Sequence, residues 1–432
     1  MKKLSLTYCT NVHALGDWAA WSDIIGRFGP AIRAELGWAS QPMGLWFPAA
    51  LVAELEKDPE AARARLRGLL AQRGITAFTC NAFPYGNFHD KVVKTKVYHP
   101  DWTTPERLAY TLSCARLLAS LLPEGSEGSV STLPLGWRMG WSEEMTRRSA
   151  ENICAYVHGA RALRDAGHVD AGATAAGVPG IGKGRTLRLG IEPEPGCVLE
   201  TIDQVTRFWE EHLRPAAQRA GLSQRDLADF CGLCYDTCHQ AVQFEDAVEA
   251  LDRLAANGIG IAKMQLSSAL EFHPDPDRGS LELRRQFVED RFLHQTRIRT
   301  PAGIAAFDDL PEALAATGTK GPKSAVGIRG ATEAMDADGL WAFPWRVHFH
   351  LPIDSQSLLD AAAVTTTRDE MLKAYRHALA HDRCRHFEVE TYTWSVLPPA
   401  HRPKDDADLA RCIARELAFI QSHTPAGNPL NA

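Results

Sequence analysis

The sequence predicts a parallel α/β barrel, and two observations support that fold class. Short apolar stretches typical of buried strands alternate with helical stretches along most of the chain, which favours a parallel sheet covered by helices. Several apolar stretches run directly into carboxylate, amide or imidazole side chains, as active-site residues do at the C-terminal ends of barrel strands. A length of 432 residues exceeds that of a typical single domain but suits one barrel with insertions.

The first half of the chain alternates regularly between the two kinds of stretch. Thr104 and Pro105 mark the clearest helix start, because threonine caps a helix N-terminus and proline suits the first helical position. A Gly- and Ala-rich stretch at 167–184 is predicted to be a surface loop. The expected strands are 4–9, 43–48, 75–80 and 128–133, and the expected helices are 17–35, 58–72, 105–122 and 142–166.

The second half raises the number of strand candidates to nine, where an eight-stranded barrel needs one fewer. The second, the seventh and the 345–350 candidate are the ones that could lie outside the barrel, and the sequence leaves open which does. Thr367 and Glu370 predict a capping box at a helix start. The expected strands are 187–192, 230–236, 259–265, 345–350 and 386–392, and the expected helices begin at Thr201 or cover 246–257, 367–381 and 405–422.

One region departs from this alternation. Residues 271–342 hold a polar helix near 280–290 and a Gly-, Ala- and Lys-rich run at 316–334. Long irregular segments within a compact fold are usually functional or disordered. We therefore expect a single barrel over residues 1–432, with 271–342 inserted as a lid that contains a disordered part.

Composition argues against several classes of function. The net charge of −6, with both signs scattered along the chain, lacks the basic face of a nucleic-acid-binding protein. Met1 to Tyr8 begins like a secretory leader, but polar residues interrupt the apolar stretch that would follow. No window approaches the roughly 18–20 apolar residues of a membrane helix. We expect a cytoplasmic protein without a membrane span, and its ten cysteines to be reduced thiols.

Acidic and imidazole side chains recur where strands are expected to end. Glu192, Asp236 and Glu390 stand at or near the ends of three of the expected strands, and His348 and His350 alternate along another. Each carboxylate alone is compatible with a buried salt bridge or a surface cap, but at matching strand ends the set predicts a metal site. Such ligands suit Mn²⁺, Mg²⁺, Zn²⁺, Co²⁺ or Fe²⁺.

Neighbouring polar residues extend this candidate site. Glu194 lies on the same side as Glu192 if the backbone stays extended and could bind substrate. His239 could bind the metal, orient substrate, move a proton or simply satisfy the loop backbone. Gln265 could be a weak ligand or, like Ser267, hold a substrate hydroxyl.

Three further features of the sequence each allow more than one interpretation. Lys263 could face the barrel, where it would stabilise an enediolate or act as a base, or it could extend outwards to solvent. The aromatic residues Tyr85 and Trp394 could line a ligand pocket or simply pack. The spacing of Cys231, Cys234 and Cys238 is only a weak indication of a zinc or iron–sulfur site, because strand periodicity places the first two on opposite faces.

The whole pattern resembles the xylose isomerase-like TIM barrels and, more specifically, the bacterial "metabolite traffic protein EboE" family. The matching stretches are Tyr8–His13, Phe83–Gly86, Tyr98–Thr104, Glu192–Cys197, Asp236–Val242, Gln265–Leu270, Val347–His350 and Glu388–Trp394. The resemblance implies a TIM barrel from a gene cluster concerned with moving a secondary metabolite or its precursor. The resemblance to the wider isomerase group implies metal ligands at Glu192, Asp236 and Glu390. Many members of that group have histidine where this chain has Gln265, and His350 is the predicted substitute.

These observations lead to three functional hypotheses. The first is a metal-dependent isomerase, epimerase or lyase acting on a polyhydroxylated small molecule, in which Glu192 or Glu390 moves the proton. The second is a non-catalytic metabolite carrier that uses the same barrel mouth, with partners among the proteins of its gene cluster. A nuclease is disfavoured by the net charge and by the few histidines near strand ends.

Overall fold

The computed structural model describes residues 4–86, 88–166, 184–275, 277, 279–317, 337–357, 364–426 and 430–431. Nearly all of the predicted loop at 167–184 and most of the predicted disordered run at 316–334 lie outside these residues. Among the described helices, none combines the length and apolar character required to cross a bilayer.

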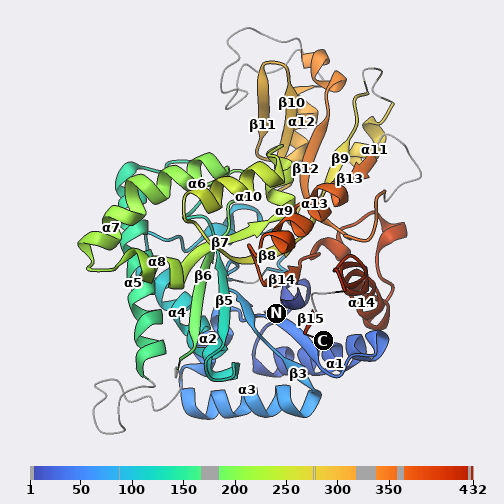
Figure 1. The fold of residues 1–432 in the computed structure, drawn as a ribbon. Helices are drawn as coiled ribbons and strands as arrows, with labels where there is room; N and C mark the ends of the chain where they lie inside the picture. Colours follow the sequence, from blue (N-terminus) through green and yellow to red (C-terminus); the bar gives the residue numbers. More distant parts are fainter. Residues whose placement is uncertain are drawn as a thin grey trace.

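Eight parallel strands close into a barrel, which confirms the predicted fold class. The ring closes where the last strand pairs with the first, so that residues from opposite ends of the chain lie side by side (Figure 1). Two short strands, β3 (Ile75–Thr76) and β15 (Leu430–Asn431), extend it in parallel with β2 and β1. The barrel strands are β1 (Leu4–Cys9), β2 (Gln41–Trp46), β4 (Thr79–Asn81), β5 (Glu127–Thr132), β6 (Thr186–Ile191), β7 (Cys231–Asp236), β8 (Ile261–Leu266) and β14 (His386–Val389).

Helices surround the barrel, and most begin at a side-chain cap. Asp17, Thr104, Ser142 and Asp405 each accept a hydrogen bond from a backbone N–H of the first turn, which satisfies a donor that the helix leaves unpaired. The longer helices are α1 (Trp18–Leu36), α3 (Pro59–Arg73), α4 (Pro105–Leu121), α5 (Glu143–Asp165), α10 (Ala247–Ala256), α13 (Arg368–Ala380) and α14 (Asp406–Ser422). Shorter ones are α2 (Ala49–Leu55), α6 (Ile202–Phe208), α7 (Arg214–Arg219), α8 (Gln224–Phe230) and α9 (Thr237–Val242), with a π-helical turn at Trp209–Leu213.

The predicted capping box at Thr367 was wrong. The hydroxyl of Thr367 accepts a hydrogen bond from the backbone N–H of Ala269, 2.8 Å away, instead of capping α13. The threonine therefore ties the start of this helix to a strand of another sheet.

A second sheet of five antiparallel strands interrupts the barrel between β8 and β14. It forms in the order β11-β10-β12-β9-β13 and stands above the barrel in Figure 1, coloured yellow to red. The 345–350 candidate is therefore the strand outside the barrel. The strands are β9 (Ser268–Phe272), β10 (Thr296–Thr300), β11 (Gly303–Phe307), β12 (Trp345–Leu351) and β13 (Val364–Thr366), with helices α11 (Leu281–Arg285) and α12 (Leu310–Ala316) and a 3₁₀ turn at Ala337–Ala342.

This sheet has its own hydrophobic core, which contains Phe272, Trp341 and Trp345 and is separate from the large core of the barrel and its helices. The sheet reaches beyond the 271–342 range on both sides, because its strands begin at Ser268 and end at Thr366. We call residues 268–366 the inserted sheet region.

Candidate metal centre

Three carboxylates meet at the C-terminal ends of the barrel strands. Glu192 follows β6, Asp236 ends β7, and Glu390 follows β14. All three side chains are buried, and one oxygen of each lies within 4.8 Å of the others. The structure therefore brings together residues that are far apart in the sequence, and we call Glu192, Asp236 and Glu390 the carboxylate triad.

Hydrogen bonds fix part of this triad and leave part of it open. Asn11 and Asn81 each donate to Glu390 Oε1, over 2.8 and 3.0 Å. Asp236 Oδ1 accepts from the backbone N–H of His239 and the hydroxyl of Ser267. Within the described part of the chain, Glu192 Oε2 and Asp236 Oδ2 are buried without a hydrogen-bond partner. Buried carboxylate oxygens without donors are costly unless a cation or proton compensates them.

The pKa values of Glu192 and Glu390 also indicate negative charge without enough positive groups or donors around it. Burial, reinforced by the negative charges of Glu390 and Asp236, raises the pKa of Glu192 well above its usual value. Burial, together with Asp236 and Glu388, does the same to the pKa of Glu390. A divalent cation at this point would let both carboxylates ionise.

A buried ion pair lies on the neighbouring barrel strands. Lys263 on β8 faces inwards and donates to Glu388 on β14, and both side chains are fully buried. Burial is the largest single influence and opposes the charged form of Lys263, but the charge of Glu388, its hydrogen bond and smaller contributions from Cys234 and Cys9 together outweigh burial, so that the pKa of Lys263 lies above its usual value. Lys263 is therefore a fixed positive charge. Gln265, two residues further along β8, is in register with Asp236 and Glu388, and its buried amide has no hydrogen-bond partner among the described residues.

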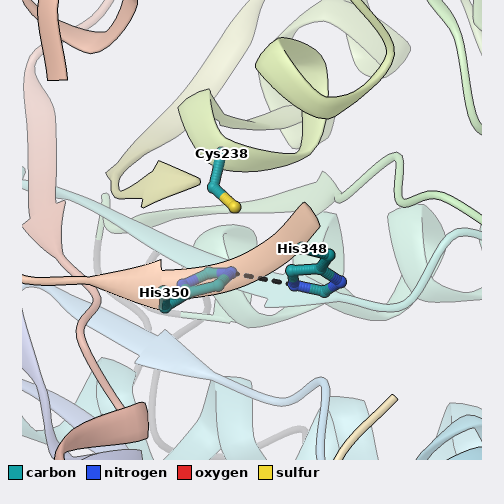
Figure 2. Close-up of side chains that lie close together, drawn as sticks. All are labelled: Cys238, His348 and His350. Carbon is teal, nitrogen blue, oxygen red and sulfur yellow. Dashed lines mark hydrogen bonds between the residues drawn. The ribbon is translucent and has the colours of Figure 1, made fainter. Parts of the chain in front are cut away.

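Three histidines complete the polar end of the barrel. His239 lies in the first turn of α9, where Asp236 caps the helix. His348 and His350 come from β12, and alternate residues of a strand share one face. The pairing of β12 with β9 shifts register between Val347 and Leu351, the segment that carries both histidines. Figure 2 shows His348 and His350 facing each other, with the Cys238 sulfur directed towards them. We call His239, His348 and His350 the imidazole triad.

The imidazole triad is also buried, with side chains at most 5% exposed. Burial lowers the pKa of His239 to about 4, although Asp236 opposes this shift. Burial also lowers the pKa values of His348 and His350. The three rings are therefore neutral near pH 7.

One cavity lies beside the two triads, and its empty space, together with the open solvent at its mouth, amounts to about 510 Å³. Glu192, Glu390 and the imidazole triad line it, whereas Asp236 lies behind this lining. Apolar and aromatic side chains cover other parts of its wall, as is usual for a small-molecule site: Phe83, Phe88, Val97, Phe292, Leu293 and Tyr392.

Of the remaining predicted site residues, Glu194 and Ser267 belong to the candidate site, whereas Tyr85 and Trp394 lie elsewhere. Glu194 lines the cavity, accepts a hydrogen bond of 2.8 Å from Tyr98 and has a pKa that burial raises to about 8. Ser267 lies behind Asp236 and donates to it. Among the described residues that line the cavity, Tyr85 and Trp394 are absent: Tyr85 packs on Tyr110, and Trp394 belongs to the core of the inserted sheet region.

Sequence reasoning did not assign site roles to three residues that the structure places there. Asn11 and Asn81 orient Glu390, and both stand at or just after a predicted strand end, which is a usable signal. Gln295 accepts from His348 Nδ1 over 2.7 Å. Gln295 lies in the irregular part of the sequence, where no strand pattern marks it.

Comparisons with known proteins bear only on the fold. No family model and no curated protein matches the chain. A xylose isomerase-like TIM barrel protein from Mycobacterium smegmatis in complex with magnesium is 10% identical, with 98% of each chain covered and a TM-score of 0.49. D-allulose 3-epimerase from Methylomonas sp. in complex with D-allulose is 12% identical, with 98% of each chain covered and a TM-score of 0.45.

A third similar structure is the probable 3-DHS dehydratase AsbF from Bacillus anthracis, at 10% identity and a TM-score of 0.43, covering 97% of this chain and 99% of that one. Identities and scores this low carry no argument about activity, because one barrel fold supports many reactions. The chemistry of this chain has to be inferred from its own residues.

Proposed function

We propose that this chain is a divalent-metal-dependent enzyme of the isomerase or epimerase type, acting on a polyhydroxylated small molecule in the cavity. The observation that supports this proposal is the carboxylate triad, whose buried oxygens converge without enough hydrogen-bond donors. Oxygen-rich sites of this kind suit hard ions such as Mg²⁺ or Mn²⁺. The residues present therefore fit an ion, which Glu192, Asp236 and Glu390 would hold, with Gln265 or His350 available to complete the set.

The ion would polarise substrate oxygens and so acidify an adjacent O–H or C–H bond. The side chains around it supply the other functions. Asn11 and Asn81 fix the orientation of Glu390, which suits a group that moves a proton at a defined position. Glu194, with its raised pKa, retains a proton near neutral pH and can hold a substrate hydroxyl.

Lys263 has a different part in this proposal. Its ion pair with Glu388 keeps it charged, and it lowers the pKa values of Glu192 and Glu390 through its positive charge. It therefore helps the carboxylate triad to ionise and does not act as a base.

The finer expectations rest on the sequence resemblance alone. A traffic role of the EboE type, partners from the same gene cluster and a purely carrying function all remain compatible with this cavity. A protein that binds the ion and a polyol but converts none of a panel of ketoses and polyols would favour the carrier.

Manganese binding tests the proposal. We expect metal-stripped protein to take up Mn²⁺, and Glu192→Gln and Glu390→Gln to weaken this uptake by about 100-fold or more, because each removes an anionic ligand. Isothermal titration with Mn²⁺ measures the change, and Glu210→Gln, at an exposed glutamate, is the matched control. Equal Mn²⁺ affinity in all four proteins would overturn the metal site, whatever the substrate.

A further inference from the structure

The imidazole triad has a geometry that its own hydrogen bonds do not explain. The Nε2 atom of His348 lies 3.1 Å from the Nε2 atoms of both His239 and His350, and these two Nε2 atoms are 3.4 Å apart. Three ring nitrogens thus point at one common position. A hydrogen bond between two of them would require a proton on one Nε2.

The other ring nitrogen of each histidine shows where its proton is. His239 Nδ1 lies 3.0 Å from the carbonyl oxygen of Pro193, and His350 Nδ1 lies 2.7 Å from that of Glu390. A carbonyl oxygen only accepts, so both Nδ1 atoms are donors. His348 Nδ1 contacts Gln295 Oε1 at 2.7 Å.

The amide orientation of Gln295 is fixed by its surroundings. Its Nε2 group lies 2.9 Å from the carbonyl oxygen of Pro195 and 3.0 Å from the Tyr98 hydroxyl. The amide nitrogen therefore faces acceptors and the amide oxygen faces His348, so that His348 Nδ1 is also a donor. With the ring proton at each Nδ1 atom, all three Nε2 atoms then present lone pairs to one another.

Lone pairs this close repel unless something positive lies between them. The Tyr392 hydroxyl lies 3.4 Å from His348 Nε2, and its single proton can serve only one of the three nitrogens. The ligand nitrogens of a tetrahedral ion with metal–nitrogen bonds of about 2.0–2.1 Å stand about 3.3 Å apart. The observed separations of 3.1–3.4 Å bracket this value.

We propose that His239, His348 and His350 form a second metal site, made of nitrogen ligands only, for a borderline divalent ion such as Zn²⁺. Three imidazoles whose Nδ1–H groups donate to oxygen atoms are a typical ligand set for zinc, and the outer hydrogen bonds fix the rings. This site is distinct from the carboxylate triad, which favours harder ions, and it stands whether or not the proposed function holds.

We place the open fourth position of this ion on the cavity side, because all three histidines line the cavity. The Cys238 sulfur lies within 4.8 Å of ring nitrogens of His348 and His350, but Cys238 is not among the described residues that line the cavity. Three protein ligands and one open position distinguish catalytic from structural zinc sites. A small molecule in the cavity would therefore meet a nitrogen-held ion beside an oxygen-held one.

Cobalt provides the test, because tetrahedral Co²⁺ absorbs strongly in the visible range. We expect metal-stripped protein to bind one Co²⁺ at this site with a tetrahedral spectrum. His348→Gln and His239→Gln are expected to weaken the binding by about 100-fold or more. His386→Gln, at the N-terminal start of β14, is the control, and near-ultraviolet circular dichroism verifies that each variant is folded.

Two further variants distinguish the alternatives. Cys238→Ser is expected to keep the cobalt spectrum, and its loss would overturn the open fourth position. Glu192→Gln is expected to keep the spectrum while losing Mn²⁺ binding, so that failure of the proposed function and failure of this site give different results. Equal Co²⁺ binding by the histidine variants and the wild type would overturn the imidazole site.

Discussion

Asp236 shows how one side chain links local structure to the candidate site. One of its oxygens caps α9 through the backbone N–H of His239 and accepts from Ser267. The other oxygen is left for the carboxylate triad. Because the cap fixes the first turn of α9, it also places the His239 ring in the imidazole triad. The three-residue spacing between Asp236 and His239 is the spacing at which an N-cap side chain bonds a backbone N–H of the first helical turn.

We expect Glu416 on α14 to make the free energy of unfolding depend on pH. Its side chain is 1% exposed and accepts from Thr391 and from the backbone N–H of Ile353. Burial raises its pKa to about 8, and the two hydrogen bonds only partly oppose this shift. The folded state therefore holds a proton that the unfolded chain releases near its ordinary value of about 4.3.

The sign of the effect follows from this raised pKa. The contribution of Glu416 to stability is fully present below about pH 4.3 and is lost as the pH rises to about 8. We expect Glu416→Gln to remove this part of the pH dependence, so that the variant gains up to about 4 kcal/mol relative to wild type between pH 5 and pH 9. Urea unfolding at several pH values measures the difference, with Glu210→Gln as the exposed control. Parallel pH profiles for Glu416→Gln and wild type would contradict the assignment.

At the scale of elements, backbone proximity limits which residues the barrel strands accept. A Cβ atom added to Gly232 on β7 would stand 2.3 Å from the carbonyl oxygen of Gly260, which itself accepts from the backbone N–H of Leu233. A Cβ on Gly260 would meet no atom of the described residues within 4 Å. Gly232 is buried within β7, whereas Gly260 is exposed and stands just before β8, so the two glycines are neighbours with very different space for a side chain.

We therefore expect Gly232→Ala to destabilise the fold by about 2–3 kcal/mol, because the β7–β8 pair has to separate to admit a methyl group. Gly260→Ala is the matched control and is expected to change stability by less than about 1 kcal/mol. Chemical denaturation measures both. An equal effect of the two substitutions would show that the strands adjust without cost.

The sequence predicted the barrel elements well, for a physical reason. Buried parallel strands are short and apolar, and capped amphipathic helices separate them. The same signal could not assign β12, because every residue of this strand is buried in an antiparallel sheet, and it therefore resembles a barrel strand. Thr367 was misassigned because a threonine side chain bonds any nearby donor, and the competing donor comes from a distant strand.

The candidate site was predictable where its residues stand at the ends of barrel strands and unpredictable where the inserted sheet region contributes. The end of each barrel strand fixes where its carboxylate lies, so the convergence of Glu192, Asp236 and Glu390 followed from the fold. The meeting of His348 with His239 depends on how the second sheet packs over the barrel. No periodicity in the sequence encodes that packing.

At the scale of the whole molecule, the barrel core and the core of the inserted sheet region are separate, and aromatic rings of the smaller core pack on a buried arginine. The Arg284 guanidinium lies 4.1 Å from the ring centre of Trp341 and 4.2 Å from that of Trp345. Its side chain is fully buried, and burial lowers its pKa to about 9. Cation–π contacts in such a dry environment stabilise by about 2 kcal/mol or more.

Removing this cation is expected to loosen the inserted sheet region and leave the barrel intact. For Arg284→Ala we expect amide hydrogen exchange in β9 and β12 to accelerate by roughly 10- to 100-fold, with barrel strands unchanged. Arg285→Ala, at the exposed neighbour that pairs only with Glu282 among the described residues, is the control. Uniform acceleration across both sheets would show that the two cores unfold as one unit.

The closure of the ring between its first and last strands has a consequence for the making of the protein. While the ribosome is still adding residues, Glu192 and Asp236 have emerged but Glu390 has not. The nascent chain therefore offers an incomplete ligand set, which holds ions weakly. For the proposed metal site, tight capture of an ion would follow the insertion of β14 between β8 and β1. An ion taken up then would hold the finished ring together, and the divalent ions present at that moment would decide which one is retained.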